Sequence, residues 1–151
     1  MADNLQATLL HTPRRQAVVQ DLEKLVNAEV ADKRGMSGLA IKSGYGVVKR
    51  VNASFVPRAI DGMLDDFVVR IQPFYDEFVQ SPHGSFADHL AAHSSTVADS
   101  LLVVTDDRAG ATKRESVKKA YGRLRPQAKK HVEQAIPRLG ALIERRAKEP
   151  A

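Results

Sequence analysis

The stretch that decides the fold is written twice in the chain. Residues Ile41–Phe67 read IKSGYGVVKRVNASFVPRAIDGMLDDF, and residues Val117–Ile143 read VKKAYGRLRPQAKKHVEQAIPRLGALI. With a shift of 76 residues and no gap, six positions are identical: Lys42, Tyr45, Gly46, Val56, Ala59 and Ile60 match Lys118, Tyr121, Gly122, Val132, Ala135 and Ile136. A repeat of this length indicates two related halves, about residues 1–80 and 84–151, within a single domain of residues 1–151.

Helical spacing of the apolar residues runs through both copies and their flanks. In the first copy, Ile41, Tyr45 and Val48 form one apolar stripe along a predicted helix. Sustained alternation of apolar and polar residues, the signal of a half-buried strand, is nearly absent. The sequence therefore predicts an all-α, single-domain helical bundle of about eight or nine helices. We expect two pseudo-symmetric halves that pack face to face.

Capping residues and prolines set the expected helix boundaries. Gly35 should end the second helix in a left-handed turn, and Ser85 with Asp88 resembles a capping box for a helix in the second half. Proline lacks the backbone donor that a helix interior needs, so Pro126 is predicted to open the last helix and Pro137 to bend it. These interruptions produce the high helix count.

The shared Tyr-Gly pairs suggest close helix contacts. An interior glycine costs a helix about 1 kcal/mol relative to alanine, so Gly46 and Gly122 are expected to permit a tight approach on a second helix face. Gly44 should allow a similar approach on the flank of the buried stripe. We further predict that the two Tyr-Gly helices lie near a pseudo-two-fold axis.

Composition excludes several classes of protein. The 151 residues contain no cysteine, which rules out disulfides, thiolate metal ligands and a thiol nucleophile. The N-terminus has an early acid and no basic segment followed by an apolar run, and no long uninterrupted apolar run occurs. We therefore expect a cytoplasmic protein with neither signal peptide nor membrane span.

Charge is distributed unevenly along the chain. Residues 1–107 hold 10 Lys and Arg against 14 Asp and Glu, whereas residues 108–151 hold 13 against 4, within a net charge of +5. Such a basic end attracts polyanions, although it is also typical of a solvated helix surface. The candidates for binding nucleic acid or another polyanion are Lys42, Lys49, Lys118, Lys119, Arg123 and Arg125.

Two histidines have the spacing of a metal chelate. His89 and His93 lie four residues apart on a predicted helix, with Asp88 next to them and His83 in the preceding turn. The zinc-protease motif needs Glu directly after its first His, where this chain has Leu90. Two half-exposed histidines on a polar helix face are the favoured explanation of the pattern. The prediction is therefore no metal and no cofactor, with His89 and His93 as the candidates if one binds.

Enzymatic motifs are otherwise missing, so no catalytic residue is assigned. The stretch before Lys42-Ser43 resembles a phosphate-binding loop, but that motif requires glycine directly before the lysine, where Ile41 stands. No Gly-x-Ser-x-Gly elbow is present. An enzyme or carrier would need a pocket between the halves, and the predicted lining residues for it are Tyr45, Phe74, Tyr75 and Tyr121.

Several longer motifs resemble a family of small actinobacterial proteins of unknown function. They include Arg15-Gln16-Ala17-Val18-Val19, Val117-Lys118-Lys119-Ala120-Tyr121 and the run from Pro137 to Arg145. The resemblance covers nearly the whole chain, but it implies an origin more than an activity. The sequence favours a non-enzymatic helical protein that acts through protein contacts, including homodimer formation. Polyanion binding by the basic C-terminal half is the alternative, and a ligand pocket between the halves is the third interpretation.

Overall fold

All regular structure in the described part of the chain is helical. The computed structural model describes residues 5–10, 14–33, 35–51, 53–82 and 84–148. These residues form seven helices: α1 (Leu5–Leu9), α2 (Arg14–Asp32), α3 (Gly35–Val51), α4 (Phe55–Gln80), α5 (Phe86–Ala92), α6 (Ser94–Ala111) and α7 (Glu115–Lys148). The predicted all-α class is confirmed. Among these helices, none combines the length and apolar character needed to cross a bilayer.

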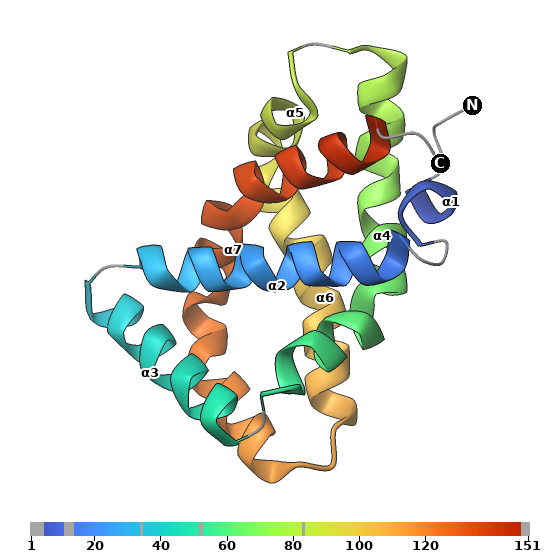
Figure 1. Cartoon of the computed structure of the whole chain (residues 1–151). Coiled ribbons are helices and arrows are strands. Elements are labelled where there is room, and N and C mark those ends of the chain that lie inside the picture. The colour runs from blue at the N-terminus through green and yellow to red at the C-terminus, as the bar shows by residue number, and fades with distance from the viewer. Residues whose placement is uncertain (1–4, 11–13, 34, 52, 83, 149–151) are drawn as a thin grey trace.

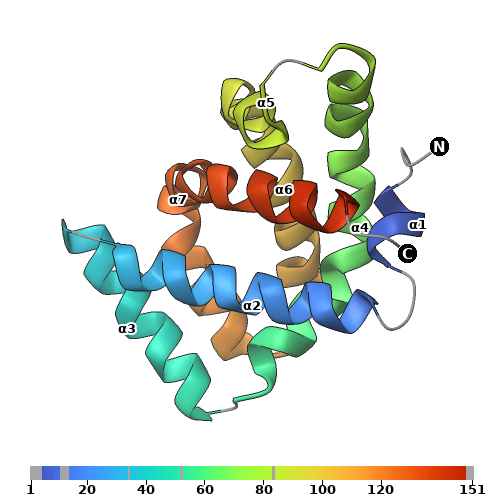
Figure 2. The same ribbon diagram turned by 45° about the horizontal axis from the view of Figure 1, so that its top comes forward.

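The long helix α7 connects most of the molecule. It packs against α5 and α6 and also contacts α1, α2 and α3 (Figure 1). Helices α4 and α6 lie side by side, and α2 crosses over α4 in both views (Figure 2). The short helix α1 lies beside α4 and the end of α7. Segments from both ends of the chain therefore share one packed unit.

The core is built from six helices, α1, α2, α4, α5, α6 and α7. Its most deeply buried large side chains are Leu5, Val18, Leu64, Phe86, Leu90, Val97 and Ile136. The ring of Phe86 meets the edge of the Tyr75 ring at a centroid distance of 5.1 Å. Such an edge-to-face pair adds about 0.5–1.5 kcal/mol beyond the burial of its area. These apolar contacts hold α5 against α4 and α7.

The predicted cap at Ser85 is confirmed, and so is the predicted left-handed conformation of Gly35, although α2 ends at Asp32 and Gly35 is the first residue of α3. The Ser85 hydroxyl accepts from the Asp88 N–H at 3.0 Å, and the Asp88 carboxylate accepts from the Ser85 N–H at 3.4 Å, which completes a capping box. Gly35 has φ of 76°, a left-handed conformation that residues with a Cβ rarely adopt. Local signals therefore locate the start of α5 correctly and the end of α2 only to within a few residues.

The predicted count of eight or nine helices is wrong for the described residues, because proline does not divide α7. Pro126 and Pro137 both lie inside this one helix, and Pro73 lies inside α4. A proline removes one hydrogen bond and bends a helix, but packing on either side can keep the helix continuous. The ribbon of α7 changes direction between its orange and red parts (Figure 1). Pro126 therefore opens no new helix.

The two copies of the repeated stretch differ in their helix boundaries. In the first copy α3 ends at Val51, residues 53–54 form a turn, and α4 begins at Phe55. The second copy lies entirely within α7. Two pseudo-symmetric halves are therefore not confirmed, and the pseudo-two-fold axis stays a prediction.

The glycines that permit close contacts are not the ones that the repeat suggests. A Cβ built at Gly44, Gly46 or Gly122 would meet no heavy atom within 4 Å, so the predicted tight contacts at these residues are wrong. By contrast, a Cβ at Gly140 on α7 would lie 2.5 Å from the Cα of Ala87 on α5. Only glycine lets the two backbones approach this closely at Gly140.

We predict opposite effects for two alanine substitutions within α7. Gly140→Ala should destabilise the fold by about 1–3 kcal/mol, the usual cost of overpacking, because the backbone of Ala87 cannot move aside as a side chain would. Gly122→Ala should stabilise it by up to about 1 kcal/mol, since alanine favours the helix and the space is open. Urea denaturation measures both changes. Equal effects at the two residues would contradict the close crossing of α5 and α7.

Candidate functional site

The predicted polyanion-binding residues lie on α3 and on the first half of α7. Lys118, Lys119 and Arg123 are exposed, and none forms an ion pair with a described residue. Lys42 is half-buried on α3 and likewise has no described acidic partner. These four cations are therefore not paired with an acidic residue of the described chain, and both polyanion binding and the convergence of the two helices on one partner stay predictions.

The other two predicted cations make equivalent contacts in the two copies of the repeat. Tyr45 donates to the Asn27 side-chain oxygen of α2 at 2.5 Å, and Lys49 reaches the same oxygen at 3.5 Å. Its counterpart Tyr121 donates to Asp106 of α6 at 2.5 Å. Arg125, the counterpart of Lys49, binds both carboxylate oxygens of Asp106, at 2.8 and 3.1 Å. In each copy, a tyrosine and a cation thus anchor the helix to the one before it.

The contacts within this network determine the pKa values of Asp106 and Tyr121. The hydrogen bonds from Arg125 and then from Tyr121 lower the pKa of Asp106 below its ordinary value. Burial, followed by the hydrogen bond to Asp106, raises the pKa of Tyr121. The carboxylate is therefore charged and the phenol neutral at neutral pH. Because Arg125 is balanced by Asp106, it is less available to an outside anion than the sequence suggests.

A pocket of about 360 Å³ opens beside this network, between the start of α4, the end of α6 and the start of α7. Three arginines, one from each neighbouring segment, contribute to its lining: Arg58, Arg108 and Arg114. The remaining lining residues are Phe55, Ala59, Met63, Thr105, Ala109, Thr112, Val117 and Tyr121. No acidic residue is among them. We call this site the arginine pocket.

The arginines of this pocket differ from five other arginines of the chain, which form ion pairs. Elsewhere, Arg15, Arg125, Arg138, Arg145 and Arg146 each pair with at least one carboxylate. The three pocket arginines pair with no carboxylate among the described residues. Their positive charge is therefore not balanced within the described part of the chain.

Local packing positions two of the three guanidinium groups. The Arg108 guanidinium occupies the space that a side chain at Gly62 would fill, so the absence of a Cβ there lets Arg108 lie across α4. The guanidinium carbon of Arg114 lies 5.9 Å from the centroid of the Phe55 ring, a cation–π distance. Sequence reasoning missed this site, since the residues come from separate helices and carry no common motif.

An apolar cavity of about 220 Å³ lies next to the arginine pocket. Thr105 lines both spaces, and successive residues of α4 face one or the other: Ala59 and Met63 line the pocket, whereas Ile60 and Leu64 line the cavity. All other side chains around the cavity are apolar. The arginine pocket and the apolar cavity are thus neighbouring spaces that share Thr105.

The aromatic residues predicted to line a ligand pocket are dispersed. Tyr121 lines the arginine pocket, but Tyr75 is buried in the core and Phe74 packs against the core. Tyr45 is bonded to Asn27 on α2. Of the four, Tyr121 alone is among the residues that line the arginine pocket.

The predicted histidine pair gains a third potential ligand from another helix. His89 and His93 lie close to Glu77 of α4, and the Nε2 atom of His89 is 3.7 Å from a carboxylate oxygen of Glu77. Asp88, which the sequence placed beside the pair, instead completes the cap with Ser85. His83 falls outside the described residues. Glu77 could not be connected to the histidines from sequence spacing.

A buried lysine fixes the end of α2 against α7. Lys33 is 7% exposed, and its ammonium donates to Glu29 at 3.2 Å and to Gln134 at 2.9 Å. Arg138 donates to Glu29 at 2.7 Å and also pairs with Asp32. The four charges balance one another, so this cluster serves as a structural ion-pair network. These contacts also explain why α2 carries the charged residue Glu29 at this position.

Comparison with known proteins identifies the family but no activity. The model of a family of unknown function, DUF6918, matches residues 5–147, and the chain belongs to this family. The predicted membership in a family of unknown function is thereby confirmed, while an actinobacterial origin stays a prediction. No curated protein and no solved structure matches the chain.

Asp106→Asn should destabilise the protein in a pH-dependent way. A carboxylate with a lowered folded-state pKa stabilises the fold above its unfolded pKa, and this contribution disappears as the pH falls through the folded pKa. The difference in unfolding free energy from wild type should therefore be largest at neutral pH and shrink below about pH 4. Urea denaturation at about pH 7 and about pH 3 measures it.

The neighbouring Asp107 provides the control for this prediction. Asp107 is exposed and forms no ion pair with a described residue, so Asp107→Asn should change stability little at either pH. Equal losses for the two variants, or a loss in Asp106→Asn that does not depend on pH, would contradict the assigned role of Asp106.

Proposed function

We propose that this member of the DUF6918 family binds a small anionic amphiphile, with the charged group in the arginine pocket and the apolar part directed toward the neighbouring cavity. The observation that carries the proposal is the presence of three arginines around one pocket without any acidic lining residue. The pocket volume of about 360 Å³ falls within the range of about 300–1,000 Å³ common for ligand sites.

The charge of the site selects an anion. Arg58, Arg108 and Arg114 present like charges to a shared space, which is unfavourable unless a negative partner or solvent screens them. Guanidinium groups suit carboxylates and phosphates because their planar donors match two oxygens at once. A carboxylate or phosphate group is therefore the expected charged part of the ligand.

The apolar surroundings determine the rest of the ligand. Phe55, Met63 and Val117 line the arginine pocket, and the adjoining cavity has apolar walls except at Thr105. A fully hydrophilic anion would leave this surface in contact with water. A long-chain carboxylate or a similar amphiphile covers it and keeps the charged group at the arginines, which supports an amphiphile over a bare anion.

A thermal-shift and binding experiment tests the proposal with defined probes. Decanoate should raise Tm through mass action, whereas acetate lacks the chain and decanol lacks the charge, so both should have a much smaller effect. Arg58→Gln and Arg108→Gln should each weaken decanoate binding by about tenfold, because each removes a charged hydrogen-bond donor. Isothermal titration measures the affinity, and Tm without ligand reports any loss of folding.

Two controls make this experiment decisive. Arg70→Gln removes an exposed arginine of α4 that is not among the pocket-lining residues, and it should leave decanoate binding unchanged. Reversal of Lys118, Lys119 and Arg123 to glutamate should likewise leave it unchanged. If only this reversal abolishes anion binding, the polyanion interpretation of the basic face replaces the pocket. If no variant or probe has an effect, the proposal is wrong.

Self-association is a second candidate function, supported by the exposed face of α3. Leu39 is 67% exposed and Val47 is 50% exposed, and at about 100° per residue the two side chains lie about 80° apart on the outer side of α3. Large apolar side chains on the outer face of one helix are suited to a second copy of the same surface. Residues of this kind fit the homodimer that the sequence favours.

Light scattering after size exclusion tests self-association. Wild-type protein should show a concentration-dependent dimer, and Leu39→Glu should shift it to monomer, because a charge cannot be buried there without a partner. Val69→Glu provides the matched control, since Val69 is a similarly exposed valine on α4 at 52%. A wild-type protein that stays monomeric at high concentration would eliminate this candidate.

A further inference from the structure

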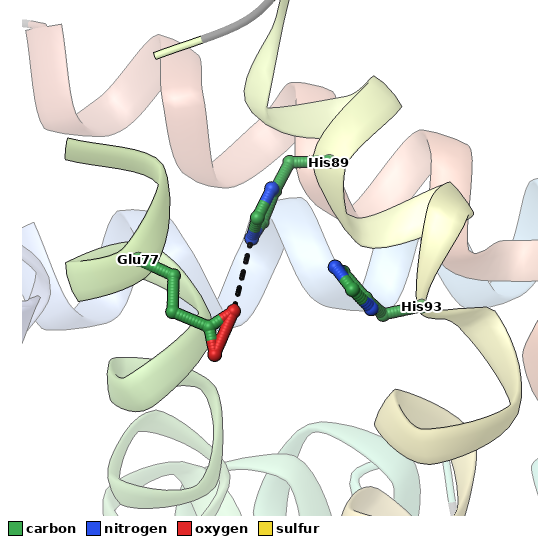
Figure 3. Close-up of side chains that lie close together, drawn as sticks. All are labelled: Glu77, His89 and His93. Atoms are coloured by element: carbon green, nitrogen blue, oxygen red, sulfur yellow. Dashed lines mark ion pairs between the residues drawn. The ribbon is translucent and has the colours of Figure 1, made fainter. Parts of the chain in front are cut away.

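A cluster of three metal-ligating groups lies where α4 meets α5, away from the residues of the arginine pocket. Glu77 belongs to the last turns of α4, His89 to α5, and His93 to the junction of α5 with α6. One ligand atom from each residue lies within 4.8 Å of the other two. The rings of both histidines and the carboxylate of Glu77 point into a common space (Figure 3).

We propose that Glu77, His89 and His93 bind a divalent transition-metal ion, with Zn²⁺ as the best match. Two imidazole nitrogens and one carboxylate oxygen form a ligand set typical of zinc sites in proteins. The sequence motif of zinc proteases plays no part here, since the carboxylate comes from a different helix. Three protein ligands leave a fourth coordination position for water.

The distances require only a small adjustment to fit a metal ion. Zinc bonds of about 2.0–2.1 Å in a tetrahedral arrangement place neighbouring ligand atoms about 3.3 Å apart. The Nε2 atom of His89 lies 3.7 Å from the carboxylate oxygen of Glu77, already close to this separation. The Glu77 side chain is 60% exposed, so it can rotate without disturbing the core.

The Nε2 atom of His89 faces the cluster and lacks a hydrogen-bond partner. This atom is buried, and the carboxylate of Glu77 lies just beyond hydrogen-bond distance. Burying such a nitrogen without a partner is unfavourable. A metal ion bound to Nε2 removes this cost, and the dashed contact in Figure 3 marks the direction in which it would sit.

Aromatic packing holds the histidine rings in place before any metal binds. The His89 ring lies 5.8 Å from Phe78 and 6.4 Å from Phe86, and the His93 ring lies 6.3 Å from Phe74. The two imidazole rings are themselves 4.9 Å apart.

The bound ion would hold α4 and α5 together across the connection between these two helices. Glu77 precedes the connection between α4 and α5, and both histidines follow it. Binding to the folded state alone raises the free energy of unfolding by mass action. We therefore expect zinc to stabilise the α4–α5 junction as well as to occupy the three ligands.

Calorimetric titration with ZnCl₂ after removal of metals by a chelator tests the site. The full-length protein should bind one ion per chain with a saturable heat, and Tm should rise with zinc. His93→Ala and Glu77→Gln should each weaken binding by at least about 100-fold, beyond the 10–100-fold typical of an outer-shell partner. Both residues are exposed, so these variants should keep their fold.

Matched variants and a spectroscopic probe decide between this site and surface binding. His131→Gln removes a histidine of α7 that is outside the cluster and should leave the zinc heat unchanged. Co²⁺ should give the visible absorption of a four-coordinate site in wild type but not in His93→Ala. A weak, non-saturating heat that is equal in all variants would mean adventitious binding and would overturn the proposal, as would the absence of any heat.

Discussion

The close crossing of α5 over α7 is the contact on which the rest of the packing depends. At Gly140 the two backbones approach so closely that no side chain fits between them. This approach lets Phe86 and Leu90 of α5 reach the same core as Ile136 of α7, and all three side chains are completely buried. Through the ring contact between Phe86 and Tyr75, the same core extends to α4. The short helix α5 thereby joins the two longest helices of the chain.

Local signals in the sequence are sufficient for the fold class but not for the tertiary contacts. Periodicity and the Ser85 cap are properties of neighbouring residues, so they identify helices correctly. Proline at residue 126 was expected to divide a helix, yet packing keeps α7 continuous there. The role of a glycine likewise depends on its tertiary neighbours, which the sequence does not show. Gly140 lies against the backbone of α5, whereas the repeated Gly46 and Gly122 face open space.

The contacts of the charged side chains were even less predictable from the sequence. The basic run in α7 suggested a set of equivalent cations, but Arg125 is bound by Asp106 while Lys118 and Lys119 are exposed. The arginine pocket combines Arg58 with two arginines about 50 residues later in the sequence, so no local motif could indicate it. The structure gives the repeated tyrosine and cation another role, in which they bind a polar side chain on the preceding helix.

Helix α4 contributes to both proposed sites, and each site also needs residues from the second half of the sequence. Its first turns provide Arg58 to the arginine pocket, and its last turns provide Glu77 to the histidine cluster. In each case the remaining arginines or histidines come from residues 89–114, which belong to the second half of the sequence. Neither half alone could form either site. The packing of α4 against α5 and α6 therefore determines the geometry of both sites.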